Sequence, residues 1–349
     1  MLLGYSRLYP PDACETALPG PADARAVLAA KRPDLVERLG DVARQVGADA
    51  RALDAALLGA ARLGLRHGTL GTDFHAYHNE GHVLDVGARR LLRMFAGMGE
   101  GAPDARDASA LLVFAACHDL RQRETVDVPG PVGGNEAASI AECFRILDAA
   151  GFDRDADRDQ YVALELMIAG STFDARPTPM PDPNTQQLPE VAGGSLARGL
   201  ALWLDSELPR WRSEPLARRG ERLARLSADL DTANVGEDFV LLCRTALQLC
   251  REREMRCGRD LAAPESALPC LEFLGRGQEA YFFELHRFNS REGERVFGQQ
   301  KLLNGPHVRA TTSALLACYE PAPPPDGADV VAAFSALTGA TDGATDRTD

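Results

Sequence analysis

Apolar positions recur every three or four residues along most of the chain, which is the pattern of amphipathic helices. The segments with this spacing are 51–65, 105–116, 136–149, 160–169, 196–204 and 239–255. No segment alternates apolar and polar residues with a period of two, and β-branched residues are sparse. The pattern therefore predicts an all-α fold, a compact bundle of many helices.

Segments rich in proline and glycine interrupt this pattern and divide the chain. DVPGPVGG at 127–134 and the stretch 176–194 are predicted to be loops. After residue 318 the sequence becomes rich in proline and then acidic. We expect an N-terminal helical segment at 1–69 packed on the core, a main domain at 70–318, and a disordered or weakly docked tail at 319–349.

Composition and charge exclude several classes of function. Of the 349 residues, 45% are hydrophobic and 26% are charged, which is ordinary for a globular protein. The 38 basic and 51 acidic residues give a net charge of −13, which argues against a nucleic-acid polymer as partner. Apolar stretches such as 110–117 are too short to cross a bilayer, and the N-terminus lacks a secretory signal. We therefore expect a cytoplasmic protein with no membrane partner.

The segment YHNEGHVLDV, which begins at residue 77, is the first that carries chemistry. His78 and His82 are four residues apart, so on one helix they would share a face. Asp85 follows His82 by about one helical turn and would lie on the same face. This spacing indicates a site that combines imidazole and carboxylate groups.

Two further segments supply an imidazole and more carboxylates. The apolar run LLVFAACHDL ends in His118 and Asp119, which near a helix end could converge on one ion. SADLDTANVGED contains Asp229 and Asp231 after a helical segment. Two imidazoles and two carboxylates suit a divalent transition metal such as Zn, Mn, Fe or Ni. A structural hydrogen-bond network would satisfy the same groups and is the alternative interpretation.

Taken in series, these motifs resemble those of the HD superfamily of metal-dependent phosphohydrolases. YHNEGHVLDV, CHD, NEAAS, ADL and the glutamine of GQEAYFF follow one another in the order found in the catalytic domain of class I cyclic nucleotide phosphodiesterases, with a bacterial character. The order is kept over residues 74–296, about two thirds of the chain. The resemblance implies an all-α HD-type bundle with a metal site between helices, and makes 70–318 the catalytic domain.

The resemblance also implies two divalent metal ions and their ligands. The first ion would be Zn, Fe or Mn, and the second, Mg or Mn, would be bridged through Asp119. The residues that match the ligands of the first ion are His82, His118, Asp119 and Asp229. Asp231 remains an alternative to Asp229.

Catalytic and substrate-binding roles follow from the same resemblance. His78 matches the general acid, Glu136 matches a carboxylate that hydrogen-bonds metal-bound water, and Asp85 matches a partner of the histidines. Gln278 matches the glutamine that hydrogen-bonds a purine, and Tyr281 stands at the place of an aromatic clamp. These roles imply a small phosphoester, in particular a nucleotide, as the binding partner.

The expected activity is hydrolysis of a phosphodiester such as a 3′,5′-cyclic nucleotide to the monophosphate, by a metal-activated hydroxide with a histidine as general acid. Two departures from the family keep alternatives open. HDLRQRET lacks the second histidine of the eukaryotic members, and the asparagine that often follows ADL comes only at Asn234. The alternatives are an HD phosphohydrolase acting on another nucleotide or on a non-nucleotide phosphoester, and a catalytically silent metal-binding regulatory domain.

Overall fold

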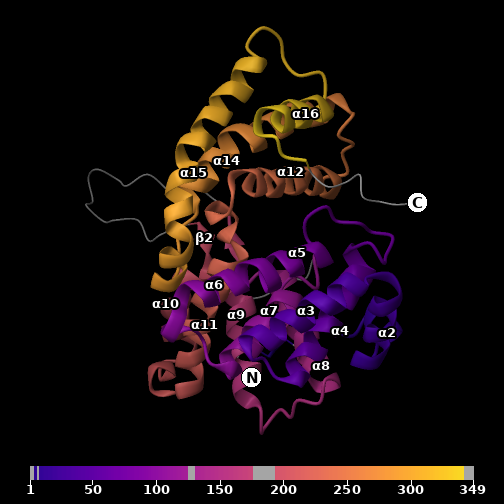
Figure 1. Cartoon of the computed structure of the whole chain (residues 1–349), viewed down its shortest axis with the longest axis vertical. Helices are drawn as coiled ribbons and strands as arrows, with labels where there is room; N and C mark the ends of the chain where they lie inside the picture. Colours follow the sequence, from indigo (N-terminus) through magenta and orange to yellow (C-terminus); the bar gives the residue numbers. More distant parts are fainter. Residues whose placement is uncertain (1–3, 6–7, 125–129, 176–192, 342–349) are drawn as a thin grey trace. The chain divides into compact units, whose positions relative to one another are not determined.

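The computed structural model describes residues 4–5, 8–124, 130–175 and 193–341. These residues form an all-α fold, as the hydrophobic periodicity predicts (Figure 1). The strands that occur in this part of the chain are β1 (Phe173–Asp174) and β2 (Gly194–Ser195), which form a short antiparallel pair. No helix in the described part has the length and apolar character that a membrane span requires.

The α-helices follow one another through both halves of the chain. They are α1 (Ala13–Ala17), α2 (Pro21–Lys31), α3 (Pro33–Val46), α4 (Ala50–His67), α5 (Glu80–Leu84), α6 (Leu91–Met98), α7 (Ala105–Cys117), α8 (Gly134–Ala149), α9 (Arg158–Ser171), α10 (Leu200–Glu207), α11 (Pro215–Asp231), α12 (Phe239–Arg256), α13 (Ala267–Glu272), α14 (Gln278–Ala280), α15 (Arg291–Cys318) and α16 (Gly327–Thr338). Among the described residues, π-helical segments interrupt them at Asp85–Arg90, Phe273–Gly277 and Tyr281–Leu285. Such segments are frequent at functional sites.

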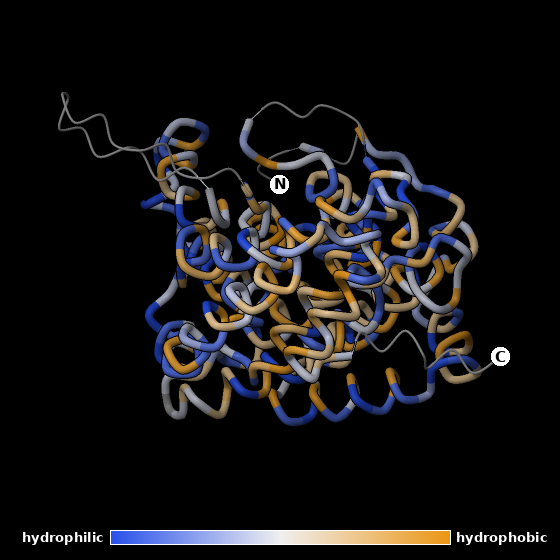
Figure 2. Tube along the Cα trace, turned by 90° about the horizontal axis from the view of Figure 1, so that it is seen from above, coloured by the Kyte–Doolittle hydropathy of each residue, from blue (hydrophilic) through white to orange (hydrophobic). Residues whose placement is uncertain are grey.

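The predicted helices agree with the observed ones within a few residues, except at 196–204. There the chain forms a 3₁₀ turn at Leu196–Arg198, and α10 begins only after Gly199. The predicted loop at 176–194 lies mostly outside the described residues. Of the predicted loop at 127–134, residues 127–129 lie outside them, 130–133 form no helix or strand, and Gly134 already begins α8. Figure 2 shows hydrophobic and hydrophilic positions interleaved along the helical turns, which is the pattern that burial of one helix face produces.

The chain divides into two compact units. The first contains the described parts of Met1–Asp174 together with Gly194–Asp231 and Asn289–Val296. The second contains Thr232–Phe288 and the described part of Phe297–Asp349. The domain boundaries expected at residues 69 and 319 stay predictions, and α4 packs against α7 within the first unit.

Close helix packing in the first unit depends on small residues. A Cβ atom at Gly59 of α4 would lie only 2.8 Å from the sulfur of Cys117 in α7. A Cβ atom at Gly220 of α11 would lie 2.7 Å from the side chain of Leu166 in α9. Glycine at these two positions lets the backbones of the paired helices approach closely.

The second unit contains a core to which the C-terminal region contributes. In α16, Val330, Val331 and Phe334 are buried in a cluster with residues of α12 and α13, and Asp326 caps the helix by accepting from the backbone amide of Asp329 at 2.8 Å. The expectation of a disordered or weakly docked tail is therefore wrong for Gly327–Thr338. Residues 342–349 lie outside the described part of the chain.

Candidate metal centre

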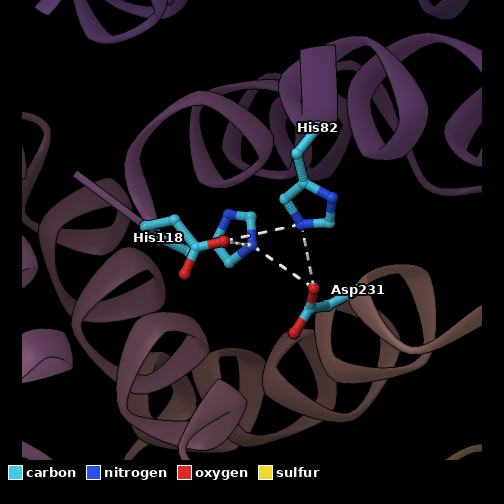
Figure 3. A group of neighbouring side chains, drawn as sticks. His82, His118 and Asp231 are labelled. Atoms are coloured by element: carbon cyan, nitrogen blue, oxygen red, sulfur yellow. Dashed lines mark hydrogen bonds and ion pairs between the residues drawn. The ribbon is translucent and has the colours of Figure 1, made fainter. Parts of the chain in front are cut away.

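Four side chains converge within the first unit: His82, His118, Asp119 and Asp231. Figure 3 labels the two histidines and Asp231. Each offers one nitrogen or oxygen atom, and these four atoms lie within 4.8 Å of one another. His82 belongs to α5, His118 and Asp119 follow α7, and Asp231 is the last residue of α11. Three segments that are distant in sequence thus bring two imidazoles and two carboxylates together.

The separations between the donor atoms match those around a bound metal ion. Nε2 of His82 lies 3.2 Å from Oδ1 of Asp231 and 3.5 Å from Oδ2 of Asp119. Nε2 of His118 lies 3.0 Å from Oδ2 of Asp119 and 3.4 Å from Oδ1 of Asp231. Two ligand atoms each about 2.1 Å from one ion are about 3.0–3.4 Å apart in octahedral or tetrahedral geometry. The cluster therefore fits a divalent metal ion.

His118 is oriented as metal-ligating histidines usually are. Its Nδ1 lies 3.1 Å from the backbone oxygen of Phe114, and because a carbonyl only accepts, Nδ1 carries the proton. With its Nδ1 proton held in this way, the ring can present an Nε2 lone pair to a metal ion. Nε2 is buried and faces the carboxylate oxygens of Asp119 and Asp231 at 3.0 and 3.4 Å. Stacking of the ring on Phe114, with centroids 4.5 Å apart, holds this orientation.

The other ligating residues are also held in place by their neighbours. The ring of His82 packs on Tyr77 with centroids 4.4 Å apart. Asp119 accepts a hydrogen bond from Nε2 of Gln122 at 2.9 Å through Oδ1, which leaves Oδ2 facing the histidines. Arg90 is completely buried and donates to the backbone oxygen of Asp231 at 2.6 Å, which anchors the end of α11 beside the cluster.

The electrostatics of the cluster favour a positive charge at its centre. Burial lowers the pKa of His118, but the carboxylates of Asp119 and Asp231 outweigh it and hold that pKa well above its usual value. Burial raises the pKa of Asp231, but hydrogen bonds and charge from His118 and His82 hold it well below its usual range. The carboxylates thus favour positive charge beside them, which protonated imidazole supplies without a metal and which a bound metal ion would supply in its place.

The assignment of Asp229 as a metal ligand is wrong. Its side chain is fully buried away from the cluster, where Oδ1 accepts from the backbone and side-chain nitrogens of Asn289 at 2.6 and 2.9 Å. Oδ2 accepts from the backbone nitrogen and the hydroxyl of Ser290 at 2.9 and 2.5 Å. Asp229 therefore anchors the start of α15, where negative charge is also favourable to the helix dipole. Two residues along a helix correspond to about 200°, so Asp231 points to the opposite side and takes the ligand position.

His78 lies beside the cluster but not on the helix that was expected. α5 begins at Glu80, with the side chain of Asn79 as its N-cap, so His78 belongs to the preceding turn. The expectation that His78 and His82 share a helical face is therefore wrong. The turn nevertheless brings the two rings together, with centroids 6.2 Å apart.

Glu136 lies within electrostatic range of the same groups. It occupies the third position of α8, and Gly133 leaves room for its carboxylate, which a Cβ atom there would touch. Burial raises the pKa of Glu136, the carboxylate charge of Asp119 raises it further, and His78 lowers it. Asp85 begins the π-helical segment and accepts from Arg89 at 2.7 Å, while its predicted partnership with the histidines stays a prediction.

Gln278 and Tyr281 belong to the second unit. Gln278 begins α14 and lines a pocket with apolar and hydroxyl-bearing neighbours: Phe239, Leu242, Cys243, Ala246, Leu274, Phe282, Val308, Thr311, Thr312 and Phe334. The hydroxyl of Tyr281 donates to Oδ1 of Asn234 at 3.1 Å. The aromatic residues that line the pocket with Gln278 are Phe239, Phe282 and Phe334. Tyr281, the expected clamp residue, is not among the lining residues and is hydrogen-bonded to Asn234 instead.

Two residues that position the cluster were missed at the sequence level, Arg90 and Gln122. The sequence did contain a sign that Asp231 faces inward. Asp231 continues the row of small residues Gly220, Ala224 and Ser227, which lies on the face of α11 that packs against α9. Arg90 carried no comparable signal, since its role depends on where α11 ends in space.

Comparison with known proteins does not name a family. The chain matches no protein-family model, and no curated protein matches it.

Proposed function

We propose that the chain is a metal-dependent phosphohydrolase of the HD superfamily that hydrolyses a phosphodiester, with 3′,5′-cyclic nucleotides as the substrate class. The observation that carries this proposal is the convergence of His82, His118, Asp119 and Asp231, with His78 beside them. The order of the corresponding motifs along the sequence supports the superfamily.

The residues around the cluster would hold two divalent ions. His82, His118, Asp119 and Asp231 would bind the first, and a carboxylate oxygen of Asp119 would extend to the second. When bound, such ions neutralise the phosphate and lower the pKa of a coordinated water. The mixed nitrogen and oxygen donors suit Zn, Fe or Mn in the first position, and Mg or Mn suits the second.

The surrounding side chains would supply the proton transfers. His78, in the turn before α5, would give its proton to the departing alkoxide oxygen of the substrate. Glu136 would accept a hydrogen bond from the attacking water and so orient it toward phosphorus. The raised pKa of Glu136, caused by burial and then by the charge of Asp119, favours its taking up a proton during the reaction.

The resemblance assigns recognition of a purine base to Gln278. The Gln278 amide supplies one donor and one acceptor for the edge of the base.

The proposal is tested with the full chain, stripped by a chelator and reconstituted with Mn²⁺ or with Zn²⁺ and Mg²⁺. Cyclic AMP, cyclic GMP, a nitrophenyl phosphodiester and a nitrophenyl phosphomonoester serve as substrates, with products identified by chromatography. We expect 5′- or 3′-monophosphates from the cyclic nucleotides, lost in His118→Asn and retained in His307→Asn, which replaces an exposed histidine of α15. Hydrolysis of the monoester alone would favour the alternative of another phosphoester, and no hydrolysis of any substrate would contradict the proposal.

A further inference from the structure

A second group of metal-ligating side chains lies in the first unit, outside the cluster described above. It consists of His67, the last residue of α4, and of Asp73 and His75 in the loop 68–79. Their donor atoms also lie within 4.8 Å of one another. The two imidazole rings are in contact, with centroids 4.1 Å apart.

The donor atoms are spaced as ligands of one ion are. Nδ1 of His67 and Nε2 of His75 each lie 3.3 Å from the same oxygen, Oδ2 of Asp73. This separation equals that expected for ligands about 2.1 Å from a tetrahedral metal ion, which are about 3.4 Å apart. The geometry thus repeats, with three residues, the arrangement in the first cluster.

The two histidines of this group are buried, whereas its aspartate is partly exposed to solvent. His67 and His75 are 3% and 0% exposed, so their rings are fixed by packing. The side chain of Asp73 is 42% exposed, and an ion can enter past it. Fixed nitrogen ligands with an entry path are what a metal site requires.

Arg123 holds the carboxylate of Asp73 in position. Its Nε donates to Oδ2 and its guanidinium NH₂ donates to Oδ1, both at 2.8 Å. This bidentate pair lowers the pKa of Asp73, so the group is an ionised ligand. Metal-ligating carboxylates are commonly held by an outer hydrogen-bond donor in this way.

Backbone contacts connect the group to the start of α5. The backbone nitrogen of His75 donates to the backbone oxygen of His67 at 2.8 Å, which closes the loop at its base. Nδ2 of Asn79 donates to the backbone oxygen of His75 at 2.6 Å, and Oδ1 of Asn79 accepts from the backbone nitrogen of Gly81 at 2.7 Å. Fixing His75 therefore also fixes the turn that carries His78.

We propose that His67, Asp73 and His75 bind a structural divalent transition-metal ion that holds the loop 68–79 closed. Two imidazoles and one carboxylate, completed by a water molecule, form a donor set that suits Zn²⁺. The site is distinct from the cluster at His82, and it does not depend on the proposed activity.

The test measures the zinc content of the full chain after chelation, reconstitution with Zn²⁺ and dialysis. In a His118→Asn/Asp231→Asn background, which disables the first cluster, one equivalent of zinc should remain. Adding Asp73→Asn should remove it, with at least about a tenfold weaker zinc affinity, whereas adding His286→Asn, a buried histidine of the second unit, should not. Retention of the equivalent in the Asp73→Asn chain would overturn the proposal.

A measurement on the wild-type chain keeps the test independent of how the variants fold. Crystals of the zinc-bound protein, recorded at the zinc absorption edge, should show an anomalous peak between His67, Asp73 and His75. Electron density for these three side chains without such a peak would overturn the proposal. Either result leaves the activity of the first cluster to be judged separately.

Discussion

Asp229 and Asp231 provide a matched pair that separates a structural carboxylate from a metal ligand. Asp231→Asn removes one of four ligands, while Arg90 still anchors the backbone of residue 231. Because loss of an outer-shell partner alone costs about 10- to 100-fold in metal affinity, loss of this ligand should cost more than about 100-fold. The asparagine keeps an oxygen that can accept from His82, so the metal-free Asp231→Asn chain should lose less stability than the metal-free Asp229→Asn chain, its loss coming from the negative charge removed beside His82 and His118.

Asp229→Asn should have the opposite effects. The Asp229 carboxylate accepts four hydrogen bonds, two from Asn289 and two from Ser290. An asparagine can offer its oxygen to only one of these two residues, so two buried donors lose their acceptor. At about 1–3 kcal/mol for each unsatisfied donor, the free energy of unfolding should fall by about 2–6 kcal/mol. The metal affinity of the folded chain should be unchanged.

The two variants are compared by urea unfolding of the metal-free chains, followed by circular dichroism, and by calorimetric titration with Mn²⁺ or Zn²⁺. The reasoning would be refuted if Asp229→Asn lost metal while remaining stable. It would equally be refuted if Asp231→Asn bound metal with wild-type affinity at the first cluster.

Three further predictions concern catalysis, recognition and the C-terminal helix. His78→Ala should lower kcat on a cyclic nucleotide by about 10²- to 10⁴-fold and leave the metal content unchanged. A nitrophenyl diester should be affected much less, because its leaving oxygen needs little protonation, and equal losses on both substrates would contradict the role of His78 as general acid. Gln278→Ala should lower kcat/KM for a purine cyclic nucleotide by about 5- to 150-fold, corresponding to about 1–3 kcal/mol. A simple diester should be unaffected, and equal effects on both substrates would exclude base recognition by Gln278. Phe334→Ala should lower the free energy of unfolding by about 3–5 kcal/mol in urea titrations. Leu337 is 42% exposed, so Leu337→Ala should change this free energy by less than about 0.5 kcal/mol. Similar values for the two variants would show that α16 is not part of the core.

Helix positions were predictable because burial of one face imposes its period directly on the sequence. The predicted segment 51–65 corresponds to α4 (Ala50–His67), and 105–116 corresponds to α7 (Ala105–Cys117). The same periodicity was present at α16, in GADVVAAFSALT, but the preceding proline run and the acidic end obscured it. The prediction of a disordered tail rested on the average composition of residues 319–349. A short helix such as α16 can pack on a core with only three or four apolar residues on one face, which the average composition does not reveal.

The sequence predicted those ligands of the cluster that can be identified from residue type and motif order alone. His82, His118 and Asp119 were identified from spacing and motif order, and the structure brings them together. The choice between Asp229 and Asp231 depends on which face α11 turns toward the cluster. The small residues along α11 mark the face that packs against α9, but the sequence does not tell that α9 is the neighbour. Arg90 could not be predicted, since its partners are backbone oxygens 140 and 141 residues away.

The most direct test of the metal centre as a hydrolytic site is the rate of nitrophenyl phosphodiester hydrolysis by the chelator-stripped chain, measured while Mn²⁺ or Zn²⁺ is added back. The account predicts no hydrolysis above background without metal, recovery that saturates as the ions bind, and no recovery in Asp119→Asn, which lacks the proposed bridging carboxylate. A rate that is the same with and without metal, or full recovery in Asp119→Asn, would contradict it.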